Sequence, residues 1–159
     1  MKIVVAAVPP VVGTLYPEPY DVPCRNRERR KLGDAAGLTQ FGVNLLTLPP
    51  GSWSAQRHWH TESDELIYVL EGEVTLVSDQ GAETLSAGDA AGFKAGDANG
   101  HCLQNRSQSR AVVLEVGTRA SLDAVHYPGI DLLVPPGEKP AMFTHLDGTP
   151  YPARPRSSK

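Results

Sequence analysis

The sequence predicts an all-β protein, a barrel or sandwich of short antiparallel strands. Its apolar residues fall into runs of about four to eight residues bounded by turn-forming residues, as strands do. The 15 glycines and 14 prolines are spread along the chain and divide it into short segments. No stretch keeps a helical periodicity over about 11 residues. Segment 31–38 comes nearest, but Gly33 and Gly37 interrupt it, so a turn is expected there.

The expected strands follow one another with a turn about every 8–12 residues, a spacing typical of barrels and sandwiches. The first is rich in β-forming residues and ends at Pro49–Pro50–Gly51, a strong stop signal. The segment Glu73–Ser78 alternates, with Val74 and Leu76 on one face, as on a half-buried strand. The expected strands are Phe41–Leu48, 52–60, 65–70, Glu73–Ser78, 82–85, Ala90–Phe93, 101–105 and 111–116.

A chain of 159 residues fits one domain. We expect an N-terminal arm with an edge strand in residues 1–40, the barrel in 41–118, and a C-terminal extension in 119–159. The extension should pack on the barrel and fray at its end. The short apolar N-terminus is broken by two prolines, which favours an edge strand over a signal peptide. Segment 141–144 is one more strand candidate.

The charge balance indicates neither a nucleic-acid-binding nor a membrane protein. The formal net charge is −3, and no run approaches the ~20 apolar residues of a membrane helix. The basic cluster in residues 25–31 is interpreted as a solvated arm or part of a dimer contact, with a phosphate or nucleic-acid patch as the alternative. Cys24 and Cys102 are far apart and make no disulfide framework, so a cytoplasmic location is expected.

Histidines gather in the β-rich centre of the chain. His58 and His60 are two residues apart, so their side chains point the same way on a strand. Glu65 follows a polar turn, and His101 begins a later strand. An isolated H-x-H pair is a weak signal, but three imidazoles and a carboxylate suit Zn²⁺, Fe²⁺, Mn²⁺ or Ni²⁺.

Two segments carry these residues in a known pattern. Residues 51–72 read GSWSAQRHWHTESDELIYVLEG, and residues 88–105 read GDAAGFKAGDANGHCLQN. In this order and separation they resemble the two motifs of the cupin family, and with their flanking strands the resemblance extends over about residues 40–118. The resemblance implies a double-stranded β-helix, or jelly-roll, barrel. It also implies one divalent metal ion per chain (Zn, Fe, Mn or Ni), held by His58, His60, Glu65 and His101.

The second motif departs from the family pattern in two places. Lys94 stands where the motif has proline, and four residues instead of two separate Gly96 from His101. The first motif has six residues, not five, between Gly51 and His58. A longer loop is therefore expected before His101, which still keeps its spacing to Asn105.

Other residue types near the motifs are weaker ligand candidates. Asp64 should point away from the histidines if Glu65 points toward them. Cys102 should face away from His101 and pack as an apolar residue. His126 and His145 lie outside both motifs. The pocket wall would come from Trp53, Phe93 or Trp59, although alternation turns the last of these outward.

The sequence as a whole is similar to a bacterial group of single-domain cupins, some labelled sugar-phosphate isomerases. The resemblance favours a metal-dependent enzyme acting on a small polar metabolite, of the isomerase or dioxygenase type. The alternative is a non-catalytic binding or sensing module, and a barrel that merely retains the histidines is the third interpretation. Glu73 and Tyr68 are candidate bases, neither of them compelling. A homodimer is expected, with the strand in residues 2–7 added to a neighbour.

Overall fold

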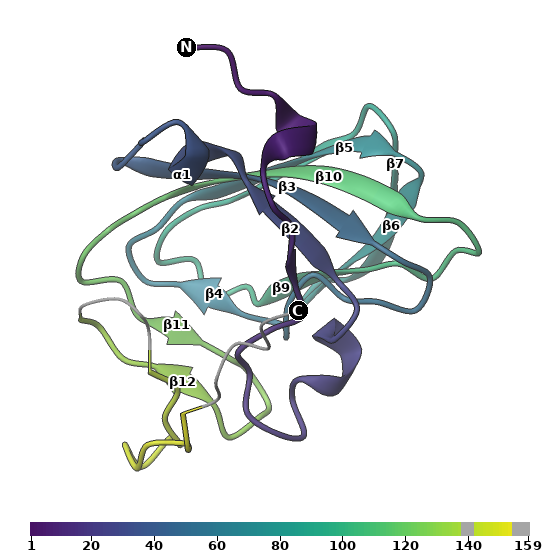
Figure 1. The fold of residues 1–159 in the computed structure, drawn as a ribbon. Helices are drawn as coiled ribbons and strands as arrows, with labels where there is room; N and C mark the ends of the chain where they lie inside the picture. Colours follow the sequence, from purple (N-terminus) through teal and green to yellow (C-terminus); the bar gives the residue numbers. More distant parts are fainter. Residues whose placement is uncertain (138–141, 154–159) are drawn as a thin grey trace.

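Strands account for nearly all the regular structure of the computed structural model, which describes residues 1–137 and 142–153. Six of them form one antiparallel sheet (Figure 1), in which β10 lies between β3 and β5. Its strands, in spatial order, are β1 (Val11–Val12), β2 (Glu28–Lys31), β3 (Phe41–Leu48), β10 (Ala111–Thr118), β5 (Glu65–Glu71) and β8 (Ala90–Phe93).

Two smaller sheets complete the barrel. One contains β7 (Gly81–Ser86), β6 (Glu73–Ser78) and β9 (His101–Gln104) in that order. The other contains β12 (Leu133–Val134), β11 (Val125–His126) and β4 (Trp59–His60). The expected all-β jelly-roll barrel is confirmed, and three of the expected strands match residue for residue, namely β3, β6 and β8.

The main core fills the space between the large sheet and the sheet of β6, β7 and β9. Alternation on β5 shows how the sequence builds it: Ile67 and Val69 are buried, while Leu66, Tyr68 and Leu70 are exposed on the other side. Full burial of one such aliphatic side chain contributes roughly 1.5–3 kcal/mol. The buried cluster consists of Leu46, Leu48, Ile67, Val69, Val74, Leu85, Leu103, Ala111 and Val113.

A second buried cluster joins the N-terminal arm to the C-terminal extension. The rings of Tyr16 and Tyr127 meet edge to face with centroids 5.7 Å apart. Leu132 and Val134 pack in the same cluster. Since β11 of the extension pairs with β4, Val125 lies opposite His60. Both ends of the chain therefore help to position a strand that carries a predicted ligand.

The predicted strand at residues 52–60 is wrong for most of its length, because only Trp59–His60 is a strand. The hydrogen bonds of the preceding residues go to separate segments. The Trp53 N–H donates to the Pro23 carbonyl at 2.8 Å, and the Ser54 N–H donates to the Leu103 carbonyl at 2.8 Å. The segment is therefore held by single bridges and not by a continuous ladder.

The N-terminal prediction is also corrected. Residues 2–7 form no strand, and Val5–Ala7 is a short 3-10 helix. The edge strand is instead β1, which pairs with β2. Segment 31–38, expected as a turn, contains the one-turn helix α1 (Leu32–Ala35). Gly33 permits this packing, since a Cβ there would lie 2.8 Å from the Val43 nitrogen.

The basic cluster is not a solvated arm. Glu28–Lys31 is an internal strand of the large sheet, between β1 and β3. Arg27, just before it, is only 8% exposed. The strand was missed because its charged residues lack the apolar alternation that predicts strands.

The C-terminal end of the chain is only partly described. The predicted fraying covers residues 150–159, of which 154–159 lie outside the described residues, whereas the Tyr151 N–H donates to the Phe143 carbonyl at 2.9 Å. The strand candidate 141–144 lies partly outside the described residues. Thr144 itself makes isolated bridges to Leu133 and Pro150.

Both cysteines are free and buried, and burial raises the pKa of each thiol to about 11. Within the described residues, no helix has the length and apolar character needed to cross a bilayer.

The glycine that closes the first motif is a sensitive position of the fold. Gly72 has a φ of +73°, and a Cβ there would lie 2.6 Å from the Arg110 carbonyl oxygen. We expect Gly72→Ala to lower the free energy of unfolding by about 2–5 kcal/mol, from left-handed strain plus the clash. Gly51 is the matched control: its φ is +77°, but a Cβ there meets nothing within 4 Å. Gly51→Ala should cost only about 1–2 kcal/mol. If urea unfolding shows the same loss of unfolding free energy in both variants, the contact between position 72 and the Arg110 carbonyl has no effect on stability.

Candidate metal centre

A backbone bridge brings the first and last predicted ligands together. The His58 N–H donates to the His101 carbonyl at 3.0 Å, and the His101 N–H donates to the His58 carbonyl at 2.8 Å. The imidazole centroids of the two residues are consequently 4.8 Å apart. Residues 43 positions apart in sequence are thus fixed as direct neighbours, independently of the longer loop before His101.

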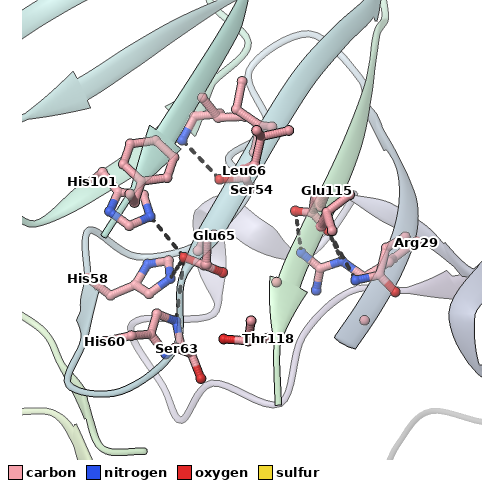
Figure 2. Close-up of a pocket in the computed structure, with 18 of the residues that line it drawn as sticks. Arg29, Ser54, His58, His60, Ser63, Glu65, Leu66, His101, Glu115 and Thr118 are labelled. Carbon is pink, nitrogen blue, oxygen red and sulfur yellow. Dashed lines mark hydrogen bonds and ion pairs between the residues drawn. The ribbon is translucent and has the colours of Figure 1, made fainter. Parts of the chain in front are cut away.

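The three imidazoles converge on one carboxylate oxygen. Oε2 of Glu65 lies 3.0 Å from Nε2 of His101, 3.5 Å from Nε2 of His60 and 3.6 Å from Nε2 of His58. Figure 2 shows these rings on one side of Glu65, with their Nε2 atoms toward it. His58, His60 and Glu65 each offer a ligand atom within 4.8 Å of the other two. The structure therefore brings all four predicted ligands together.

Hydrogen bonds at the far side of two rings set their tautomers. Nδ1 of His58 lies 2.8 Å from the Gln56 carbonyl, which only accepts, so this nitrogen carries the proton. Nδ1 of His60 lies 2.6 Å from Oδ2 of Asp123. In both rings the lone pair is left on Nε2, the atom that faces Glu65. These residues fit a divalent metal, because their free lone pairs point to a common place.

The third imidazole is held by packing. The ring of His101 stacks on that of Phe93 with centroids 3.5 Å apart, and the whole residue is 6% exposed. Its Nδ1 is buried with no hydrogen-bond partner among the described residues. Burial lowers the pKa of His101, which favours the neutral ring that metal ions bind.

The acids of the cluster are ionised. Burial by itself would raise the pKa of Glu65, but the hydrogen bond with His101 and the neighbouring His58 and His60 rings outweigh it and hold this pKa well below its usual range. Burial also acts against Asp123, yet the Glu62 N–H, 2.9 Å away, and His60 lower its pKa. Ionised carboxylates suit the binding of a metal ion.

The cluster opens into a cavity of about 550 Å³ within the barrel. Tyr16 and Phe93 contribute ring surface to its wall. Arg29 and Glu115 line the side away from the histidines, as Figure 2 shows. A cavity of this size accommodates a small metabolite.

Most of the other residues considered as ligands or bases do not line this cavity. Glu73 is exposed and Tyr68 is 40% exposed, and neither of these two candidate bases lines the cavity. Asp64 accepts the Ala95 N–H at 2.8 Å, away from the histidines, as expected. His126 stacks on Trp59, and His145 stacks on Tyr151. Of the aromatic wall candidates, Phe93 lines the large cavity, and Trp53 packs against the second cluster.

Two groups of residues near the cluster were not predicted from the sequence. Asp123 lies in the C-terminal extension, beyond both motifs, and no spacing rule connects it to His60. Arg27, Arg29 and Lys31 also line the cavity. Their spacing of two residues was a visible signal, because it places three cations on one face of a strand.

The chain is thus a jelly-roll barrel whose interior brings three imidazoles and a carboxylate together as a candidate metal site. The Cupin domain family matches residues 44–117, from β3 to β10. A sugar phosphate isomerase of the cupin superfamily from Silicibacter pomeroyi is 40% identical, with a TM-score of 0.90; the match covers 96% of this chain and 98% of that one. The chain belongs to the cupin superfamily.

Two further solved structures are similar over most of the chain. A protein described as a candidate sugar phosphate isomerase from Acidithiobacillus ferrooxidans is 28% identical with a TM-score of 0.71, covering 81% of this chain and 82% of that one. The polyketide cyclase RemF from Streptomyces resistomycificus is 25% identical with a TM-score of 0.60, covering 74% and 78%. No curated protein matches the chain in sequence.

Proposed function

We propose that this cupin is a metal-dependent enzyme that isomerises a small, hydroxylated, phosphorylated metabolite. The convergence of three Nε2 atoms on the Glu65 carboxylate, at the wall of a 550 Å³ cavity, carries the proposal. The ligands would be His58, His60, Glu65 and His101, and the ion Zn, Fe, Mn or Ni. The Silicibacter pomeroyi relative, a sugar phosphate isomerase, supports this reaction type over a dioxygenase.

A bound divalent ion supplies Lewis acidity toward a carbonyl or hydroxyl oxygen of the substrate. The chain itself orients the ligands: Gln56 and Asp123 fix the rings of His58 and His60, and Phe93 fixes that of His101. The Glu115 carboxylate and the Tyr16 hydroxyl line the same cavity, which makes them the groups to test for proton transfer in place of Glu73 and Tyr68.

Turnover with defined metals tests the proposal. Metal-stripped protein would be reloaded separately with Zn²⁺, Fe²⁺, Mn²⁺ and Ni²⁺ and incubated with a panel of phosphorylated aldoses and ketoses, read by proton NMR. We expect interconversion of one aldose–ketose pair with a loaded metal and none after chelation. Oxygen consumption without isomerisation would favour a dioxygenase. Binding of a sugar phosphate without any turnover would favour the non-catalytic binding module.

The assembly and location stay predictions. A homodimer would cover exposed apolar surface, and Leu66, Tyr68 and Leu70 on the outer side of β5 form one such stripe. The neighbour-pairing strand proposed for residues 2–7 is not the means, since Val5–Ala7 is helical. Two buried free thiols suit the proposed cytoplasmic location.

A further inference from the structure

Three cations line the cavity from β2 and the residue just before it, at alternate positions. Residues directly opposite in an antiparallel pair share a face of the sheet. Arg29 lies opposite the core residue Leu46, and Lys31 lies opposite Asn44, which also lines the cavity. Arg27, two residues before Arg29, lines it as well. The inward face of this strand is therefore basic, in contrast to the apolar inward faces of β3 and β5 next to the main core.

Arg29 is held in place with part of its guanidinium still free. Its Nε and Nη2 atoms donate to the two carboxylate oxygens of Glu115 at 2.7 Å and 2.9 Å. This bidentate pair fixes the plane of the guanidinium. Nη1 has no hydrogen-bond partner among the described residues, and the side chain is 25% exposed, in a residue that lines the cavity. A donor fixed in this way is suited to bind an oxyanion.

Positive charge is in excess on this side of the cavity. Four cationic side chains and four carboxylates line the cavity, but Glu65 and Asp123 lie at the histidine cluster, so only two carboxylates lie beside the cations. The cations are Arg27, Arg29, Lys31 and Arg119, and the carboxylates are Glu115 and Asp34. Burial and the neighbouring Arg29 both lower the pKa of Arg27, so the two guanidiniums repel each other. A doubly charged anion would relieve this repulsion.

The positive charge gathered beside β2 favours a phosphate monoester, which carries a charge of about −1.5 to −2 near neutral pH, over a singly charged carboxylate. The distance to the histidine cluster is short. Glu65 pairs with Gly117 on β10, and Glu115 lies two residues away, about 7 Å along the strand. One small metabolite can therefore reach both groups.

We propose that the inward face of β2 is the subsite for the phosphate group of the substrate, with Arg29 as its principal donor and Arg27 and Lys31 supplying further positive charge. The proposal rests on the proposed function for the statement that the bound molecule is a substrate. The recognition of a phosphate monoester by these side chains does not require the metal. It explains why a strand of the barrel wall is composed of charged residues.

The test is a titration of the metal-stripped full chain with glycerol 3-phosphate, followed by phosphorus NMR and calorimetry, with glycerol and glycerate as comparisons. The wild type should bind glycerol 3-phosphate at least about tenfold more tightly than glycerate and should show no binding of glycerol. Arg29→Gln should weaken phosphate-ester binding by about tenfold or more. Arg30→Gln is the matched control, since Arg30 is on the same strand, opposite Leu45, and does not line the cavity. It should stay within about twofold of the wild type.

Arg29→Gln leaves Glu115 without its partner, so the double variant Arg29→Gln/Glu115→Gln is measured beside it, with circular dichroism to verify the fold. It should also lose phosphate-ester binding. Wild-type affinity in either variant, equal loss in Arg30→Gln, or tighter binding of glycerate than of glycerol 3-phosphate would overturn the proposal. Because the titrations use metal-stripped protein, this failure is separate from a failure of metal-dependent turnover.

Discussion

Glu65→Gln will abolish most of the stabilisation that the fold gains from its metal. A metal that binds only the folded chain, at 1,000 times its Kd, contributes about 4 kcal/mol. For a chain of this size that corresponds to a rise in Tm of roughly 8–16 °C. The carboxylate oxygen of Glu65 is the point at which the three Nε2 atoms meet, so an amide removes both the negative charge and the central ligand. We expect the variant to show less than about a quarter of this shift.

Differential scanning fluorimetry of metal-stripped protein, with and without added Zn²⁺, Mn²⁺, Fe²⁺ or Ni²⁺, measures the effect. Glu71→Gln is the control: Glu71 ends the same strand but makes an exposed ion pair with Arg110, 3.0 Å away. It should keep the full wild-type shift. A wild-type shift in Glu65→Gln would mean that the metal binds elsewhere.

Asp123→Asn will weaken metal binding by about 10–100-fold, although the residue is no ligand. The carboxylate accepts from Nδ1 of His60 at 2.6 Å and so leaves the lone pair of the ring on Nε2. An asparagine can instead donate to Nδ1, which moves the ring proton to Nε2 and blocks that lone pair. The change is nearly isosteric, so the fold should persist.

Asp131→Asn provides the comparison, because Oδ2 of Asp131 makes the same contact with Nδ1 of His145, at 2.7 Å. That pair is exposed and does not line the cavity. Competition with a chromophoric chelator gives the metal Kd of each variant. We expect Asp131→Asn to match the wild type. An unchanged Kd in Asp123→Asn would show that the hydrogen bond does not control the His60 ring.

The barrel and the clustering of the candidate ligands were predictable because their signals are local. Alternation on Glu73–Ser78 and the stop at Pro49–Pro50 mark strands from neighbouring residues alone. The spacing of His58 and His60 turns both side chains the same way, Glu65 opens the next strand along the chain, and His101 follows from its motif. The four residues do lie together as expected.

The rest of the site depends on pairing between distant segments, which no local pattern encodes. Asp123 reaches His60 because β11 of the C-terminal extension pairs with β4. Arg29 and Lys31 face inward because β2 pairs with β3. From its composition alone, such a charged segment would be expected in solvent. Burial of Arg27 and Arg29 requires partners such as Ser54 and Glu115, which lie far along the chain. Tertiary contacts therefore override the composition of the segment.

Metal content tests the central claim most directly. Protein purified without an affinity tag would be analysed by inductively coupled plasma mass spectrometry beside the double variant His58→Ala/His101→Ala, with circular dichroism to confirm that both are folded. We predict about one divalent metal ion per wild-type chain and almost none in the double variant. A wild type without metal, even after incubation with Fe²⁺, Mn²⁺, Ni²⁺ and Zn²⁺, would contradict the claim and leave a metal-free binding barrel.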